Sequence, residues 1–568
     1  MAASTSLAHA EASREAAGSN HATRSSRSVS RGRSRKHHSP FIIHTVDCLG
    51  KSSKDLYSAV ATALGWEEVD VEAKNASKVV RPTIFCLMQT ADLLRRLPSL
   101  GAGSWASRYV GAPDVCDKGN LARMFKVCQA LCSQEEFAFN PQTWVLPEQL
   151  DELRGMLESS RGTYIVKPED GSQGDGIFLV QGLRDLDVKL SVKHNASAVV
   201  QKYISKPLLL SGLKFDLRMY VFVLGGSTTR EPMVFLSREG LARFCTEAYE
   251  APSHGNMHKC MSHLTNYSLN KRSDKFEHCS EAMEEVFSES NGASKRPLSV
   301  ALRQLASEYP DFCIDTFYAK VAEVVQGTVA VMAVAMRAYH RSVSEATDDM
   351  KSFQVFGFDI ILDDQYNCFL LEVNNAPSLC IDEALPFDEP NELPVHAGRV
   401  GGRTREKEKP CRCMDMAQVH WHKTSLVDLA VKQAVVQGAF ETLELLSKGQ
   451  GSCSSNYLPV EVTDDPLWPT LTSLEALYSR AGGAAKAFTT SGLRRNLGSL
   501  CSPGNFEKHD LDVLAQRYRP TNFVTHDRDS KPDALRLFDY ATLLMHVVGR
   551  VFPHLPLSEG LAQALQIL

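Results

Sequence analysis

Two carboxylates interrupt two otherwise apolar strand-like segments. Asp359 lies within FGFDIILD, and Glu372 lies within LLEVN, with Asn374 two residues later. Residues two apart on a strand share a face, and an antiparallel partner strand can bring Asp359 opposite Glu372 and Asn374. Two carboxylates and an amide oxygen form a hard-oxygen set that suits Mg²⁺ with phosphate ligands. The alternative is a salt-bridged or solvent-facing strand end, but buried unpaired charges are costly, which favours the metal site.

A glycine-rich loop, EDGSQGD, lies between the strand-like runs TYIVKP and GIFLV. It follows Lys167 and contains Gln173 and Gly174. Glycines allow close backbone approach, and exposed N–H groups can cradle a phosphate. The loop is neither of the GxxxxGK[ST] type nor of the strand–GxGxxG–helix type, because a strand follows it. Alone it indicates phosphate binding only weakly, since glycine-rich hairpin turns are common.

Further polar residues gather near the ends of predicted strands. The segment from Gln201 to Ile204 can offer backbone edges to an adenine. Lys214, Asp216 and Arg218 alternate along one strand and therefore share one face. Each such residue is more often on the surface than in a site. Together they supply the parts of phosphoryl transfer: lysine on the phosphates, carboxylates for the metal and arginines for the developing charge. The remaining members of the set are Arg238, Arg243, Thr265, Asn266 and Lys271.

These residues require a scaffold of β-rich segments with flanking helices, so the predicted fold class is α/β, more narrowly α+β. The strands are expected at 163–168, 176–180, 198–204, 214–225, 233–244, 353–363 and 368–374. Helices are expected at 52–66, 312–342 and 425–446. Residues 448–456 are predicted to be a linker, and residues 457–568 a helical accessory module.

Composition limits the possible functions. Of 568 residues, 43% are hydrophobic and 23% charged, which is enough to bury a core. The apolar run TVAVMAVAM at 328–336 is too short to cross a bilayer, and no apolar signal segment opens the chain. Fifteen dispersed cysteines favour a reducing, intracellular compartment.

Charge is distributed unevenly along the chain. The net charge is −5, but the Ser/Arg-rich residues 1–40 carry seven Arg or Lys against two Glu, which leaves the remainder near −10. Residues 1–40 have too few large apolar residues to fold, so we expect a disordered arm. The acidic remainder argues against nucleic acid as a partner of the body of the chain, where any acidic partner requires a local basic patch. The basic arm is either a solvated tail or a segment that binds RNA or an acidic surface.

Eight motifs occur in an order that resembles the tubulin tyrosine ligase-like enzymes. They are IVKP, GSQGDGI, QKYI, KFDLR, REGLARF, HLTNYSLNK, FGFDIILD and LLEVN. The finer resemblance is to the tubulin polyglutamylase branch of the long-chain, elongating type, through CMSHLTNYSLNK, SKRPLS and SLVDLAVKQAVVQGAFETL. The resemblance implies an ATP-grasp fold of mixed and antiparallel sheets over 41–447. Its expected parts are an N-terminal region (41–160), a central region (161–213) and a C-terminal lobe (214–447) with a loop at 384–415.

The resemblance also implies roles for individual residues. ATP would be contacted by Lys167, Gln173, Gly174, Gln201, Lys202, Tyr203, Ile204, Lys214, Asp216, Thr265 and Asn266. Mg²⁺ would be held by Asp359, Glu372 and Asn374. Free L-glutamate would be held by Arg243, Tyr267, Lys295 and Lys432, and the catalytic set would be Lys167, Lys214, Arg218 and Arg243. Gln173 is similar to the residue of elongating members, where initiating members carry arginine. The long loop at 384–415 departs from the family and makes the placement of Lys432 less certain.

The activity implied is an ATP- and Mg²⁺-dependent ligase that adds glutamate to glutamate side chains or chains on the acidic C-terminal tails of tubulin. The reaction would pass through an acylphosphate. The implied location is the cytoplasmic microtubule cytoskeleton, with cilium, flagellum or basal body as candidate sites. Two alternatives stay open: a glycine ligase of the same fold, and a non-catalytic microtubule-binding relative.

Overall fold

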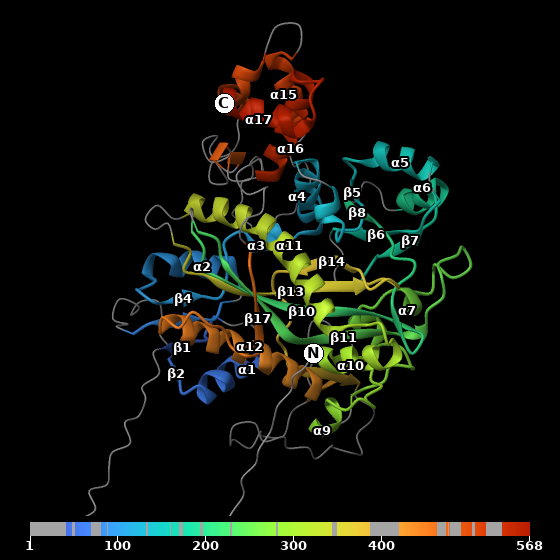
Figure 1. Ribbon diagram of the computed structural model, residues 1–568, viewed down its shortest axis with the longest axis vertical. Helices are drawn as coiled ribbons and strands as arrows, with labels where there is room; N and C mark the ends of the chain where they lie inside the picture. The colour runs from blue at the N-terminus through green and yellow to red at the C-terminus, as the bar shows by residue number, and fades with distance from the viewer. Residues whose placement is uncertain are drawn as a thin grey trace, which may run out of the picture. The chain divides into compact units, whose positions relative to one another are not determined.

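A seven-stranded antiparallel sheet, the main sheet, forms the centre of the protein (Figure 1). Its strand order is β12–β11–β10–β13–β14, with β9 added beside β10 and β17 beside β11. The strands are β9 (Leu209–Leu210), β10 (Leu213–Leu224), β11 (Met233–Ala248), β12 (Lys295–Pro297), β13 (Phe353–Leu362), β14 (Cys368–Asn374) and β17 (Tyr457–Val460).

The computed structural model describes most of the chain from residue 41 onwards. The described ranges are 41–47, 51–69, 81–87, 89–131, 134–159, 161–169, 174–192, 197–227, 230–279, 282–343, 349–386, 420–462, 473–474, 476–477, 490–501, 506–517 and 537–568. The predicted arm at 1–40, nearly all of the predicted loop at 384–415, and Gln173 lie outside these ranges.

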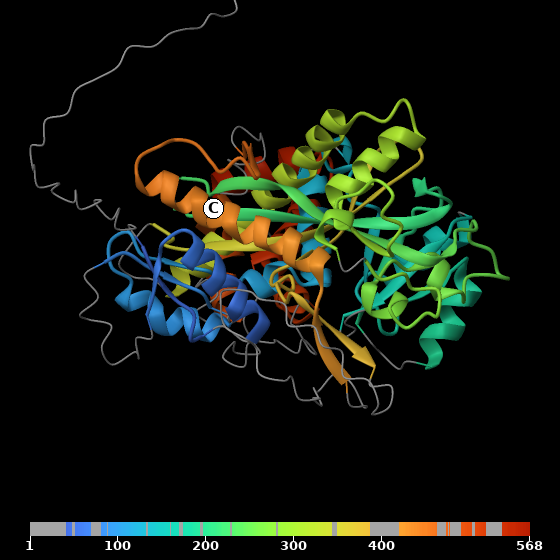
Figure 2. The same cartoon turned by 90° about the horizontal axis from the view of Figure 1, so that it is seen from below.

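Alternate residues of β10 face two different hydrophobic cores. Met219, Val221 and Val223 belong to a core that includes helix α11 (Ile314–Val343). Tyr220 and Phe222, which point to the other side, belong to a core that includes helix α12 (Leu426–Ser447). Both faces of the main sheet are therefore covered, as the period-two side-chain alternation of a strand requires. Figure 2 shows α12 running along the sheet.

Helix α11 contains a long apolar stretch. By length and composition alone its stretch Ile314–Arg337 could cross a membrane, but most of this stretch is buried inside the protein. Val325, Val329 and Met332 are completely buried in the main core. Packing against the main sheet accounts for this apolar composition.

Two smaller sheets flank the main one. The first is parallel, with the order β2–β1–β3–β4, and helix α1 (Lys51–Ala63) shares a core with it. The second is antiparallel, with the order β5–β8–β6–β7. Their strands are β1 (Ile42–His44), β2 (Glu67–Glu68), β3 (Thr83–Phe85), β4 (Trp105–Ala106), β5 (Thr143–Leu146), β6 (Tyr164–Pro168), β7 (Phe178–Val180) and β8 (Ala198–Lys202).

Helices and one hairpin complete the described structure. The hairpin is β15 (Asp382–Pro386) with β16 (His420–Thr424). The other helices are α2 (Thr90–Arg96), α3 (Ala112–Val115), α4 (Lys118–Leu131), α5 (Leu150–Ser159), α6 (Leu183–Val192), α7 (Cys260–His263), α8 (Tyr267–Asn270), α9 (Met283–Val286), α10 (Leu298–Glu308), α14 (Thr490–Leu497), α15 (Lys508–Arg517), α16 (Leu537–Val551) and α17 (Leu557–Ile567).

All seven strands and three helices expected from the sequence are present, with ends that shift by a few residues. Two boundaries differ from the expectation. Strand β5, placed in the N-terminal region, pairs with β8 in the central sheet. Residues 457–460, placed in the helical module, form strand β17 on the edge of the main sheet, because a strand can find its partner far away in sequence.

Candidate active site

A cavity of about 650 Å³ lies between the β6–β8 sheet and the main sheet. Twelve of its lining residues were selected from the sequence: Lys167, Gln201, Lys202, Tyr203, Ile204, Lys214, Asp216, Arg243, Thr265, Asn266, Asp359 and Glu372. We call it the nucleotide cavity because its wall combines the predicted phosphate-binding lysines with Asp359 and Glu372, two of the three predicted magnesium ligands; Asn374 does not line it.

Two buried lysines form the basic part of the nucleotide cavity. The Lys167 ammonium donates to Gln201 Oε1 at 2.9 Å and to the backbone oxygen of Leu371 at 3.2 Å. The Lys214 ammonium donates to the Tyr203 hydroxyl at 2.8 Å and to the backbone oxygen of His263 at 2.7 Å. Burial lowers the pKa of both lysines, that of Lys214 to about 8.

Two arginines and two aspartates form a network across neighbouring strands at the cavity, and all but Arg218 line it. Arg243 on β11 donates to both oxygens of Asp216 at 2.7 Å and to Asp359 Oδ2 at 2.8 Å. Arg218 on β10 donates to both oxygens of Asp359, and Thr265 Oγ1 donates to Asp216 Oδ2 at 2.7 Å. Burial alone would raise the pKa of Asp359, but Arg218 and Arg243 hold it well below its ordinary value. Asp359 is therefore ionised, and its charge is balanced within the wall.

The predicted magnesium ligands lie on adjacent strands. Asp359 on β13 is paired in register with Glu372 on β14, and Asn374 Nδ2 donates to Glu372 Oε1 at 3.3 Å. That bond uses the amide nitrogen of Asn374 and not its oxygen. The donor set is thus all-oxygen and fits Mg²⁺. The salt-bridged alternative also holds in part, because Asp359 pairs with both arginines. Among the described residues there is no group of three or more His, Cys, Asp and Glu that could hold a metal ion.

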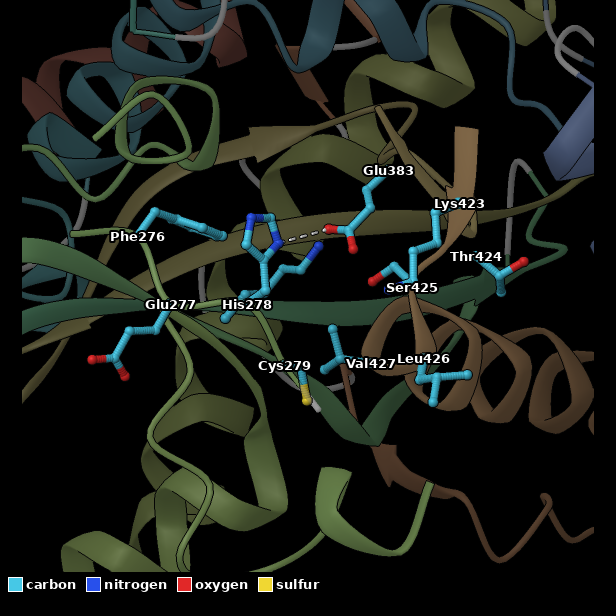
Figure 3. A pocket seen from close by; sticks show the side chains of 11 residues that line it. Phe276, Glu277, His278, Cys279, Glu383, Lys423, Thr424, Ser425, Leu426 and Val427 are labelled. Atoms are coloured by element: carbon cyan, nitrogen blue, oxygen red, sulfur yellow. Dashed lines mark ion pairs between the residues drawn. The ribbon is translucent and has the colours of Figure 1, made fainter. Parts of the chain in front are cut away.

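A second cavity of about 380 Å³ lies at the beginning of helix α12, and we call it the α12 cavity (Figure 3). Lys295 on β12, one of the predicted glutamate ligands, lines it. His278 and Glu383 form an ion pair at 3.5 Å in its wall. Lys295 is paired in register with Arg243 of the nucleotide cavity, so the two cavities adjoin one ladder of strands β11 and β12.

The other predicted residues lie near these cavities without lining them. Arg218 donates to Asp359, which lines the nucleotide cavity. The centre of the Tyr267 ring lies 4.2 Å from the ammonium nitrogen of Lys295, which lines the α12 cavity. Lys432 donates to Asp428 Oδ1 at 2.8 Å and to the backbone oxygen of Cys380 at 2.6 Å. Gly174 packs beside Asn266, and a Cβ added to Gly174 would lie 3.0 Å from Asn266 Cγ.

Sequence reasoning missed the apolar wall of the nucleotide cavity and the carboxylate between the two lysines of the predicted glutamate set. Ile165 and Ile361 lie two residues from Lys167 and Asp359 on the same strands, so strand alternation could have indicated them. Asp428 lies four residues before Lys432, which is the spacing of a helical ion pair. The remaining missed lining residues are Ile177, His263, Leu264 and Leu371.

Residues 112–387 match the profile of the tubulin-tyrosine ligase family. The chain contains a tubulin-tyrosine ligase family domain. Its fold is the predicted α+β ATP-grasp type, with mixed helices and antiparallel sheets. Every lining residue of the nucleotide cavity falls inside the matched range, whereas Asp428 and Lys432 fall beyond it.

Three relatives are tubulin polyglutamylases. The chain is 36% identical over 286 residues to tubulin polyglutamylase TTLL11 of Mus musculus, and this alignment covers 49% of the chain and 37% of the relative. It is 32% identical over 299 residues to TTLL6 of Homo sapiens, covering 51% and 30%. It is also 32% identical over 314 residues to TTLL7 of Mus musculus, covering 53% and 32%. The chain thus aligns with about a third of the length of these relatives.

Proposed function

We propose that this tubulin-tyrosine ligase family protein is an ATP-dependent ligase that joins glutamate to glutamate residues of tubulin C-terminal tails. The observation that carries the proposal is the nucleotide cavity, which Lys167 and Lys214 line together with Asp359 and Glu372. The relatives named as tubulin polyglutamylases support tubulin as the acceptor and glutamate as the donor.

In the proposed reaction an oxygen of an acceptor carboxylate attacks the γ-phosphorus of ATP, and the bond to the β-phosphate oxygen breaks to release ADP. The amino nitrogen of free glutamate then attacks the carbonyl carbon of the acylphosphate, phosphate leaves, and the nitrogen loses a proton. Lys167 and Lys214 would stabilise charge on the phosphate oxygens. No side-chain nucleophile is needed, since binding brings the reactants together.

The magnesium ion would be held by Asp359, Glu372 and Asn374, whose oxygens fit it. When bound, it would neutralise charge on the phosphates. Arg218 and Arg243 would hold the Asp359 carboxylate in a fixed orientation on the wall. Glutamate would lie near Arg243, Tyr267 and Lys295, where the strand register brings the two cavities together.

Several finer points belong to the proposal. Gln173, which lies outside the described residues, would favour elongation of glutamate chains over initiation. The acceptor tails are acidic and would require a local basic surface, because the chain carries a net charge of −5. The expected location is the cytoplasmic microtubule cytoskeleton, with cilium, flagellum or basal body as candidate sites.

Mass spectrometry of tubulin tails tests the proposal. Purified protein is incubated with ATP, Mg²⁺, microtubules and one amino acid at a time. Mass increments of glutamate on the tails, which require ATP, are expected. Increments of glycine would support the glycine ligase instead, and no increment with any amino acid would support a non-catalytic microtubule-binding protein. Tubulin that already carries one glutamate branch, compared with unmodified tubulin, separates elongation from initiation.

A further inference from the structure

Three charged side chains form a buried cluster beside the α12 cavity. Asp428, in the first turn of α12, accepts hydrogen bonds from the Lys295 ammonium through Oδ2 and from the Lys432 ammonium at 2.8 Å through Oδ1. The exposed fractions of the three side chains are 6%, 9% and 6%. We call this the Lys295–Asp428–Lys432 cluster, and its formal charge is +1.

Only one member of the cluster reaches the wall of the α12 cavity. Lys295 lines the cavity, whereas Asp428 and Lys432 do not. Lys432 is held by Asp428 and by the backbone oxygen of Cys380, at 2.6 Å. The positive charge that faces the cavity therefore comes from Lys295, and the other two residues lie behind it.

The surroundings of Lys295 leave Asp428 as the main support of its charge. Burial alone would lower the pKa of Lys295, but Asp428, with smaller contributions from Tyr267 and Glu383, raises the pKa above its ordinary value. The Tyr267 ring lies 4.2 Å from the ammonium, which is a cation–π contact. Lys295 and Lys432 in turn lower the pKa of Asp428, against the effect of burial.

We propose that Asp428, supported by Lys432, is a positioning residue that holds Lys295 in place and charged so that Lys295 can receive a carboxylate of the amino-acid substrate. This inference rests on the proposed function, because it assumes that the substrate is anionic. It adds a residue outside the range matched by the family profile. Without Asp428, the two buried ammonium groups would lose the carboxylate that they share, only weaker contributions, such as that of Glu383 to Lys295, would remain, and burial would favour loss of a proton.

The test compares Asp428→Asn with the wild type by the KM for glutamate and the KM for ATP at pH 7 and pH 9. The Asp428→Asn change keeps the shape and removes the charge. Because burial then lowers the pKa of Lys295, more of its charge is lost at pH 9 than at pH 7, and the ratio of variant to wild-type KM for glutamate should rise severalfold between the two pH values. The KM for ATP should stay within about twofold of the wild type, since Asp428 does not line the nucleotide cavity.

Glu444→Gln is the matched control. Glu444 lies on the same helix and accepts from Lys448, four residues later, at 2.8 Å, but it is remote from the α12 cavity in sequence. Its KM ratio for glutamate should be the same at both pH values. An Asp428→Asn ratio that is equally flat in pH, in a folded protein, overturns the inference.

A second pair of variants covers the case in which Asp428→Asn does not fold. Lys432→Met and Lys432→Met/Asp428→Asn both lack the rear lysine and differ only at Asp428. The KM ratio should rise with pH in the double variant and stay flat in Lys432→Met, and identical profiles contradict the inference. A wild-type protein with no glutamate incorporation at all overturns the proposed function itself.

Discussion

Arg243 and Asp216 face each other on strands β11 and β10 and share two hydrogen bonds of 2.7 Å each. The same guanidinium reaches Asp359 on β13 at 2.8 Å, so one arginine balances two buried carboxylates. Both aspartate side chains are at most 5% exposed. Removal of Arg243 would leave two charges without their shared partner.

Arg243→Met should therefore lower the free energy of unfolding by about 3–5 kcal/mol, the range for breaking a buried ion pair. Urea unfolding followed by circular dichroism measures it. Arg154→Met is the control, because Arg154 and Asp187 form an exposed pair, 44% and 47% accessible, that should contribute less than about 1 kcal/mol. Equal losses for the two variants would contradict a structural role for the buried network.

Glu372→Gln should reduce ligation by about 100-fold or more, because an amide replaces a carboxylate in the proposed magnesium set. The fold should persist, since the change keeps the side-chain shape. Ligation rates over a Mg²⁺ titration provide the measurement, and circular dichroism checks the fold. Asp364→Asn, an exposed carboxylate in the turn between β13 and β14, serves as the control and should behave like the wild type. A fully active Glu372→Gln would exclude Glu372 as a ligand.

Lys214 predicts a pH dependence of nucleotide binding. Burial lowers the pKa of Lys214 to about 8, so its ammonium loses a proton as the pH rises through that value. If the charged form binds the phosphates, the affinity for ATP should fall about tenfold between pH 7 and pH 9. Isothermal titration calorimetry at several pH values measures this change.

The arginine variant of Lys214 is the control for the pH effect. Lys214→Arg keeps its charge at every pH in the range, because the guanidinium pKa is far higher. Its affinity for ATP, although lower overall, should be flat between pH 7 and pH 9. A fall of the same size in Lys214→Arg would assign the pH dependence to another group.

The strands and the residues that alternate along them could be predicted from the sequence, and their register could not. Lys214, Asp216 and Arg218 share a face of β10 because side chains of a strand alternate. The contact of Arg243 with Asp216 and Asp359 depends on the register of β10 with β11 and with β13. The sequence of the segments that connect these strands does not indicate that register.

Long-range pairing also explains the missed boundary and the missed carboxylate. Strand β17 returns to the edge of β11 across more than two hundred residues, a contact that no local pattern indicates. Asp428 was accessible in principle, because it precedes Lys432 by four residues on a predicted helix. Its second partner, Lys295, comes from β12, so only the folded chain shows that one carboxylate serves both lysines.

Gly174 lies in the predicted phosphate loop and has a φ of +89°, a backbone conformation that residues other than glycine rarely adopt. A Cβ there would lie 2.8 Å from Leu269 Cδ1 and 3.0 Å from Asn266 Cγ, and Asn266 lines the nucleotide cavity. Gly174→Ala should therefore displace Asn266 and raise the KM for ATP by about tenfold, in addition to a loss of stability of about 1–2 kcal/mol from the backbone strain.

Gly182→Ala separates these two effects. Gly182 has a φ of +105°, and nothing lies within 4 Å of a Cβ added to it, so its variant carries the backbone strain alone. Both variants should lose similar stability in thermal unfolding, but only Gly174→Ala should change the KM for ATP. An equal rise in the KM for ATP in Gly182→Ala would assign the effect to backbone strain and not to the crowding of Asn266. The reason is that the two glycines share a positive φ, but only Gly174 lies beside Asn266.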